Sequence, residues 1–214
     1  MKTFKIKKKK IGINLPTYFI ADIGANHDGS LSRAKKLILL AKQAGADAAK
    51  FQHFSAKTIV SDLGFKKLKK LKSHQSKWKK SVYSVYQAAS INKKWTRILK
   101  KYCDKIGIEF MTSPYSMKIV DEINPFVNAI KIGSGDITWI DIIKKIASKK
   151  KLGIIATGAA NIKEVELAIS LARKTFSEFE SLSSPNAILL KTVSLNKVTD
   201  CETIDICDRR FLME

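Results

Sequence analysis

The sequence predicts an α/β fold of the (β/α)8 TIM-barrel type, incomplete at about six strand–helix units. Two observations lead to this prediction. Short, continuously apolar segments alternate with segments of helical periodicity, which is typical of a parallel sheet covered by helices. Polar residues also lie near the carboxyl ends of several of the apolar segments, as they do at the mouth of a barrel. A complete barrel takes about 250 residues, so a chain of 214 residues is short by about two units.

Six apolar segments are the predicted strands. Each is bounded by turn residues such as Gly, Asn or Pro, and each is too short to be an average helix. They cover residues 17–24, 46–54, 107–114, 127–133, 152–158 and 186–194.

Local signals predict where the helices between these strands begin. Ser30 and Asn161 have the side chains that cap helix N-termini, and Met117–Ile123 reads as one short helix. Thr138 is predicted to open another helix, with Asp141 three residues later completing an acidic variant of the capping box.

An open, doubly wound sheet is the alternative to a barrel. Such a sheet gathers its polar residues at one switch point and usually has a Gly-rich turn after its first strand. Here the corresponding turn, "GANHDG", lacks the dinucleotide-binding pattern. The polar residues are spread over different strands, which favours the barrel; they are Asp22, Lys50, Gln52, Ser113, Lys131 and Thr157.

Composition limits the cellular setting. The sequence has no apolar run long enough to cross a membrane, and the basic run Lys5–Lys10 is not followed by the apolar region of a signal peptide. The three cysteines fit neither a zinc spacing nor a disulfide framework. The expectation is a cytoplasmic protein with no membrane partner.

The net charge of +21 raises the alternative of nucleic-acid binding. All but five of the 40 basic residues are lysines, and they are scattered over most of the predicted helices. Proteins that read nucleic acid rely more on arginine. Trp78, Tyr83 and Tyr86 are interpreted as packing residues, so a nucleic-acid partner is not expected.

An anion site is predicted from two lysines in matching positions. Lys131 lies between isoleucines in "AIKIGSGD", and Lys50 lies between Ala49 and Phe51. An ammonium among apolar residues is costly unless it reaches water or an anion. A single lysine of this kind is usually a surface residue, but two of them with nearby hydroxyls and glycine turns predict a site for a small dianion such as a phosphate ester.

Two carboxylates, Asp22 and Asp136, are expected at the same rim, where they would act as acid or base or bind a sugar hydroxyl. His27 and His53 are weighed as metal ligands. Each stands alone rather than in a ligand cluster, so both are interpreted as structural or solvated.

The combined motifs resemble those of the sialic acid synthase family, which makes nonulosonic acids. The resemblance rests on "FIADIGANHDGSLSRAKKLILLAKQAGADAAKFQ", "IEFMTSPYS", "AIKIGSGDI" and "IIATGAANIKEVELAI", in the family's order and spacing. It covers residues 11–170, and "FKIKKKKIG" resembles the β-hairpin that precedes the family's barrel. The implied organisation is a hairpin at 1–16, a partial TIM-barrel synthase domain at 17–199 and a divergent tail at 200–214.

The resemblance implies condensation of phosphoenolpyruvate with the open-chain aldehyde of an N-acylated amino sugar, with loss of phosphate and help from Mn²⁺ or Mg²⁺. Asp22 and Asp136 stand where the family usually has glutamates and are the implied catalytic residues. Asn26 and His27 match its Asn-His pair and are implied at the substrate rim. The implied phosphoenolpyruvate-binding residues are Lys50, Gln52, Ser113, Lys131, Ser134 and Thr157.

The resemblance is lost after Pro185. The family's metal-binding histidines and its C-terminal domain would lie beyond Glu214, so no metal ligand is assigned in this chain. We therefore expect a truncated copy that does not turn over on its own; a homodimer is a further expectation from the resemblance. The alternative is a non-catalytic, basic anion- or nucleic-acid-binding protein on a partial barrel scaffold.

Overall fold

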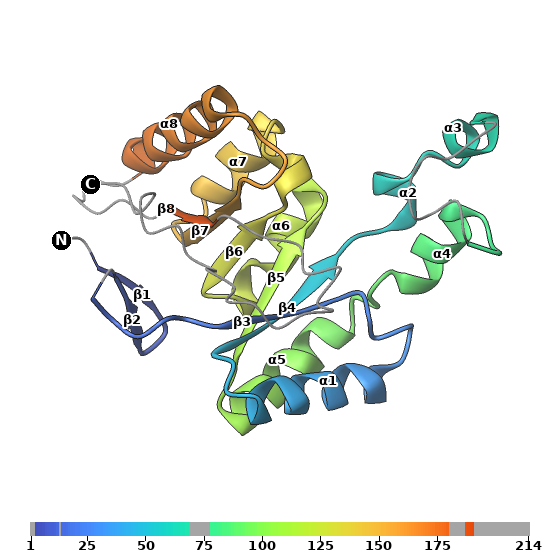
Figure 1. The fold of residues 1–214 in the computed structure, drawn as a ribbon, viewed down its shortest axis with the longest axis horizontal. Helices are drawn as coiled ribbons and strands as arrows, with labels where there is room; N and C mark the ends of the chain where they lie inside the picture. The colour runs from blue at the N-terminus through green and yellow to red at the C-terminus, as the bar shows by residue number, and fades with distance from the viewer. Residues whose placement is uncertain (1–2, 13, 69–77, 180–186, 191–214) are drawn as a thin grey trace, which may run out of the picture. The chain divides into compact units, whose positions relative to one another are not determined.

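The computed structural model describes residues 3–12, 14–68, 78–179 and 187–190. These residues form the helices and strands labelled in Figure 1, which belong to two compact units. One unit comprises residues 19–127, and the other comprises residues 1–18 together with 128–214. Each unit is described below by itself.

The unit of residues 19–127 contains three parallel strands, β3 (Ile20–Gly24), β4 (Ala48–His53) and β5 (Glu109–Pro114). β4 pairs with both others, and it is buried along almost its whole length. The pairing register shifts in β3 between Asp22 and Gly24, so that Asp22 pairs with Lys50 and Gly24 with Phe51.

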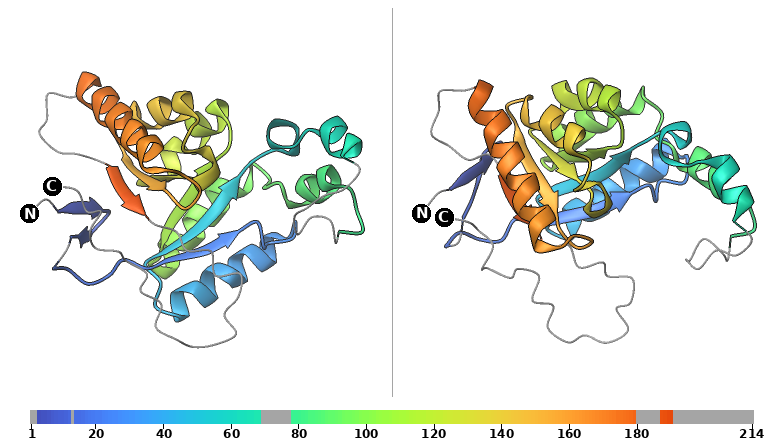
Figure 2. Two further views of the ribbon diagram at one scale, coloured as in Figure 1. Left: turned by 45° about the horizontal axis from the view of Figure 1, so that its top comes forward. Right: turned by 90° about the horizontal axis from the view of Figure 1, so that it is seen from above.

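Two helices of this unit, α1 (Leu31–Gln43) and α5 (Trp95–Ile106), pack beside one another against the strands (Figure 2). The core between them contains large, fully buried side chains such as Ile38, Leu99 and Phe110. The cap prediction for α1 is confirmed, because Oγ of Ser30 accepts a hydrogen bond from the backbone N–H of Arg33 at 3.2 Å.

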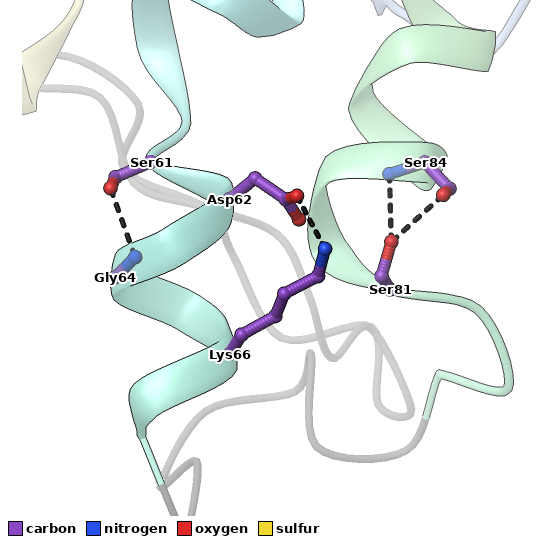
Figure 3. Close-up of polar contacts among 6 residues, drawn as sticks. All are labelled: Ser61, Asp62, Gly64, Lys66, Ser81 and Ser84. Atoms are coloured by element: carbon purple, nitrogen blue, oxygen red, sulfur yellow. Dashed lines mark hydrogen bonds and ion pairs between the residues drawn. The ribbon is translucent and has the colours of Figure 1, made fainter.

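A small lobe follows β4 and consists of α2 (Ala56–Ile59), α3 (Asp62–Lys67) and α4 (Val82–Ala89). Figure 3 shows how its last two helices begin: Ser61 accepts a hydrogen bond from the N–H of Gly64 at 3.0 Å, and Ser81 accepts one from Ser84 at 3.1 Å. Asp62 and Lys66 form an ion pair of 2.6 Å on the surface of α3. The unit closes with α6 (Met117–Ile123) and the 3₁₀ turn η2 (Asn124–Phe126).

The second unit contains the predicted hairpin of β1 (Phe4–Ile6) and β2 (Lys9–Ile11), which pair antiparallel. It also contains three parallel strands, β6 (Ala129–Ile132), β7 (Leu152–Ala156) and β8 (Ala187–Leu190). The helices α7 (Ile140–Ala147) and α8 (Ile162–Phe179) lie beside one another in this unit (Figure 2).

The start of α7 was predicted wrongly. Residues Ser134–Asp136 form a 3₁₀ turn, η3, and the backbone N–H of Trp139 donates to the carbonyl of Asp136 at 2.9 Å. The chain is still turning at Thr138, so α7 begins at Ile140 without a side-chain cap. The predicted cap of α8 is confirmed by reciprocal bonds between Asn161 and Glu164, of 2.8 and 3.0 Å.

The strand predictions are confirmed in number and order, but the observed strands are up to three residues shorter at an end. The predicted tail at 200–214 and the end of the sixth predicted strand lie outside the described residues. None of the helices in the described part of the chain combines the length and the apolar composition that a bilayer crossing requires.

Candidate active site

Alternation along β4 gives this strand two chemically different faces. Successive side chains of a strand point to opposite faces, so Lys50 and Gln52 share one face, and Phe51 and His53 share the other. Lys50 is 3% exposed although it carries a charge. A buried ammonium needs a compensating partner.

Asp22 of β3 supplies that partner. Its Oδ1 lies 2.8 Å from Nζ of Lys50, on the strand directly paired with β4. The carboxylate side chain is 58% exposed, so the ion pair is buried at the lysine and exposed to solvent at the aspartate. An anion approaching from the exposed end would have to share Lys50 with Asp22 or displace the carboxylate from it.

Ser113 of β5 adds a hydroxyl beside this pair. It pairs in register with Gln52, which places its side chain on the face that also carries Lys50. Ser113 is 1% exposed, and its Oγ has no hydrogen-bond partner among the described residues. A buried hydroxyl without a partner is costly, which is typical of a group that binds a ligand.

Gln52 is held by Tyr115, a residue that sequence reasoning missed. Nε2 of Gln52 donates to Oη of Tyr115 at 3.0 Å. Tyr115 directly follows the strand end at Pro114, and its backbone N–H donates to the carbonyl of His53 at 3.0 Å. Its position just beyond a predicted strand was the one sequence signal that pointed to it.

The other face of β4 and β5 holds a closed polar network around His53. Thr112 donates its hydroxyl proton to the carbonyl of Phe51 at 3.1 Å, so it accepts from Nδ1 of His53 at 2.7 Å. Nε2 of His53 then accepts from the hydroxyl of Thr96 on α5 at 2.8 Å. Burial, with a smaller contribution from nearby His27, lowers the pKa of His53 to about 4. His53 is therefore a neutral structural group.

Asn26 and His27 follow β3 but differ in exposure. Asn26 is exposed, and its carbonyl accepts a 2.8 Å hydrogen bond from Nε of Arg33. His27 is fully buried, with its ring edge-on to that of Trp95 at 5.7 Å, and its Nδ1 accepts from the N–H of Gly29 at 3.2 Å. Burial lowers the pKa of His27, although Asp28 opposes the shift. Within the described ranges, no group of three His, Cys, Asp or Glu residues could hold a metal ion.

The second unit contains a comparable combination of lysine and carboxylate. Lys131 of β6 is 8% exposed, and Asp136 follows it in η3. Burial raises the pKa of Asp136, and the charge of Lys131 opposes that rise. Ser134 begins the same 3₁₀ turn and is half-buried.

Thr157 lies directly after β7, in the turn that leads to α8. It is half-buried, and its carbonyl accepts a hydrogen bond from the N–H of Ala160 at 3.2 Å. Each unit thus combines a buried lysine, a carboxylate and at least one hydroxyl on or just after its parallel strands. Such groups can bind a phosphate or carboxylate and can transfer a proton.

The chain is similar in sequence to known proteins. A family model described as the NeuB family matches residues 37–195. The chain is 34% identical over 168 residues to N,N'-diacetyllegionaminic acid synthase of Campylobacter jejuni, which covers 78% of this chain and 50% of that protein. It is 28% identical over 194 residues to human N-acetylneuraminate-9-phosphate synthase, which covers 87% of this chain and 51% of that protein.

The chain is also similar to solved structures. The N-acetylneuraminic acid synthetase of Leptospira borgpetersenii serovar Hardjo-bovis, in complex with citrate, has a TM-score of 0.75 at 28% identity. The similarity covers 90% of this chain and 60% of that chain. A truncated 3-deoxy-D-arabino-heptulosonate 7-phosphate synthase of Thermotoga maritima has a TM-score of 0.58 at 13% identity, over 95% of this chain and 62% of that chain, which shows the fold alone. The chain spans about half the length of the curated relatives that it matches.

Proposed function

This chain belongs to the NeuB family, and we propose that it carries the phosphoenolpyruvate-binding part of a synthase that makes a nonulosonic acid. The fold is an incomplete α/β barrel of the TIM type, as the sequence predicts. The proposed reaction condenses phosphoenolpyruvate with an N-acylated amino sugar and releases phosphate. We propose a hairpin at 1–16, a synthase domain at 17–199 and a separate tail at 200–214 as its domain boundaries.

The observation that carries this proposal is the combination of Lys50 and Ser113 on one buried face. Lys50 is a desolvated cation, and Ser113 has a buried Oγ without a partner among the described residues. A phosphate or carboxylate would accept a hydrogen bond from each of them. Hydrogen bonds between an ion and a protein are stronger than neutral ones, especially away from water.

The remaining assignments are proposals by position. Gln52 is proposed to contact phosphoenolpyruvate beside Lys50, and in the second unit Lys131, Ser134 and Thr157 are proposed to supply further contacts to this substrate. Asn26 is proposed at the substrate rim. His27 is fully buried, so its proposed part in that rim is to support the loop that carries Asn26.

The carboxylates Asp22 and Asp136 are proposed to move protons. Phosphoenolpyruvate would compete with Asp22 for Lys50, which would leave the exposed carboxylate beside the substrate as a base or as an acceptor for a hydroxyl. Burial raises the pKa of Asp136, which favours its protonated form and suits a proton donor.

Mn²⁺ or Mg²⁺ is the expected cofactor of a synthase of this type. The described residues do not fit a metal site, because they form no group of three ligands and both ring nitrogens of His53 are bonded to threonines. The steps proposed above therefore involve only the protein's own groups. A homodimer is a further proposal from the family resemblance.

Calorimetry and thermal unfolding with phosphoenolpyruvate test the proposal. A ligand that binds only the folded state raises the free energy of unfolding by about 2.7 kcal/mol at a concentration of 100 Kd. We expect saturable binding of phosphoenolpyruvate, with weaker binding of pyruvate, which lacks the phosphate. Equal stabilisation by phosphoenolpyruvate, pyruvate and sulfate would show a non-specific anion effect and would exclude the proposed function. Phosphate release with N-acetylmannosamine and Mn²⁺ then tests turnover.

A further inference from the structure

The hydrogen bond between Gln52 and Tyr115 fixes a group that is otherwise free to turn. The terminal torsion of a glutamine side chain is broad and roughly two-fold, so its amide oxygen and nitrogen exchange places easily. Here Nε2 of Gln52 donates to Oη of Tyr115 at 3.0 Å, in a part-buried setting. The amide oxygen of Gln52, Oε1, and Oδ1 of Asp22 both approach Gly24. They lie 3.6 and 3.5 Å from the position that a Cβ on this glycine would occupy.

Tyr115 is in turn held by a row of aromatic side chains. Its ring lies edge-on to that of Phe54 at 6.1 Å, and Phe54 lies 5.6 Å from Tyr86 of α4. Tyr86 lies 6.2 Å from Trp78. These centroid separations are within the range of favourable aromatic pairs, which stabilise one another beyond the area that they bury.

This aromatic row (Trp78, Tyr86, Phe54, Tyr115) connects the lobe of α2, α3 and α4 to the strand ends. Phe54 directly follows β4, and Tyr115 directly follows β5. The backbone N–H of Tyr115 is anchored to the carbonyl of His53, whose ring is fixed by two threonines. The backbone of Tyr115 is thus tied to β4, and its ring, which carries the hydroxyl, packs against the ring of Phe54.

We propose that Tyr115 is a positioning residue for Gln52, and that the α2–α4 lobe acts on the candidate site through the aromatic row. The lobe thereby helps to position a side chain of the candidate site, a role that its lysine-rich sequence does not indicate. The consequence for binding rests on the proposed function, whereas the positioning of Gln52 does not. A change at Trp78, at the far end of the row, would alter the amide of Gln52 without touching a ligand.

Nuclear magnetic resonance of the ligand-free chain tests the positioning. The side-chain NH₂ signals of Gln52 are identified by their loss in Gln52→Glu. In Tyr115→Phe, which keeps the ring and removes only Oη, we expect these signals to shift and their nuclear Overhauser contacts with the residue 115 ring to weaken. Trp78→Leu is expected to shift the same signals. Tyr102→Phe, on α5 outside the row, is the matched control and should leave them in place.

Unchanged Gln52 signals in Tyr115→Phe would overturn the proposal. Unchanged signals in Trp78→Leu, with a shift in Tyr115→Phe, would remove the lobe from it and overturn that part. Both results are read without substrate, so they do not depend on the proposed function.

Calorimetry with phosphoenolpyruvate tests the consequence for binding. Loss of one neutral hydrogen bond corresponds to roughly a 2- to 10-fold change in Kd, so we expect Tyr115→Phe to weaken binding by that factor. In a chain that already carries Gln52→Ala, the same change should cost nothing more, because the two residues act as a unit. Additive losses would contradict the coupling and overturn this consequence. Absence of binding by the unmodified chain would instead refute the proposed function, and the resonance experiment would still decide the role of Tyr115.

Discussion

Nζ of Lys50 lies 2.8 Å from Oδ1 of Asp22, with the lysine side chain 3% exposed and the aspartate side chain 58% exposed. The lysine of this pair is therefore buried, whereas the aspartate is in contact with solvent. Charge attraction across it is weakened by solvent at the aspartate, so its contribution to stability is modest. Its larger significance is that the buried ammonium has a carboxylate partner, and that this partner lies at the exposed side of the pair.

The first prediction concerns Lys50→Met, which keeps the length and the apolar contacts of the side chain. A charge-assisted hydrogen bond contributes roughly 1.5–3 kcal/mol, so we expect phosphoenolpyruvate to bind at least about 10-fold more weakly in calorimetry. The melting temperature should change little, because the carboxylate of Asp22 that loses its partner is 58% exposed and stays hydrated. Lys66→Met removes the exposed pair with Asp62 (Figure 3) and is the control, with unchanged affinity. Equal affinity in both variants would remove Lys50 from the site.

The second prediction compares two neighbouring hydroxyls of β5. Ser113→Ala removes a buried Oγ that has no partner in the described chain, so we expect the free energy of unfolding to stay constant or rise. Thr112→Val breaks bonds to Phe51 and His53 and should lower it by about 1–3 kcal/mol. Denaturant unfolding measures both. Affinity for phosphoenolpyruvate should fall in Ser113→Ala; a stable variant with full affinity would show that this hydroxyl contacts no ligand.

The third prediction concerns the carboxyl of Asp136 in Lys131→Met. Burial raises the pKa of Asp136 above its ordinary value of 3.8, and Lys131 opposes the rise. Removing the ammonium should therefore raise this pKa further, which carbon-detected titration of the side chain would measure. The folded chain binds the proton of Asp136 more tightly than the unfolded chain does. The free energy of unfolding therefore falls as the pH rises from 3.8 through the raised pKa of the folded state. Asp136→Asn should flatten that dependence, and a lower pKa in Lys131→Met would contradict the assignment.

The fourth prediction concerns stability in acid. Burial lowers the pKa of His53 from 6.5 to about 4. Between these values the unfolded chain carries a proton that the folded chain does not, so the free energy of unfolding falls as the pH drops from 6.5 to 4. The limit for one such group is about 1.4 kcal/mol per pH unit. His53→Gln should lower the slope of stability against pH in this window, whatever it does to the stability itself. An unchanged slope would show that other groups cause the acid sensitivity.

The elements that the sequence predicted best are those specified by adjacent residues. The helix at Met117–Ile123 has the predicted bounds, and Ser30 and Asn161 cap their helices as expected, because capping depends on residues within one turn. The start of α7 was missed because the 3₁₀ turn after Gly133 is followed by a turn that still includes Thr138, where the helix was predicted to open.

The site could be predicted only in part, for a related reason. Residue types and strand ends made Lys50, Gln52 and Ser113 candidates, and the pairing register places all three on one face. The partners of these residues depend on contacts between segments 28 to 63 positions apart, such as Asp22 with Lys50 and Gln52 with Tyr115. Neither pairing leaves a local pattern, so Tyr115 and the aromatic row required the folded chain.

A change in the length of β3 is a different kind of mutation from a substitution, because the shift of pairing between Asp22 and Gly24 already accommodates one extra residue. Deleting Ile23 would regularise the ladder, but it would remove a buried side chain and shift the turn after Gly24 relative to Asp22 and Lys50. The exposed turn at Gly45, between α1 and β4, has no such constraint on its length. We therefore expect insertions and deletions to accumulate at that turn, while the number of residues in β3 stays fixed even where its sequence drifts.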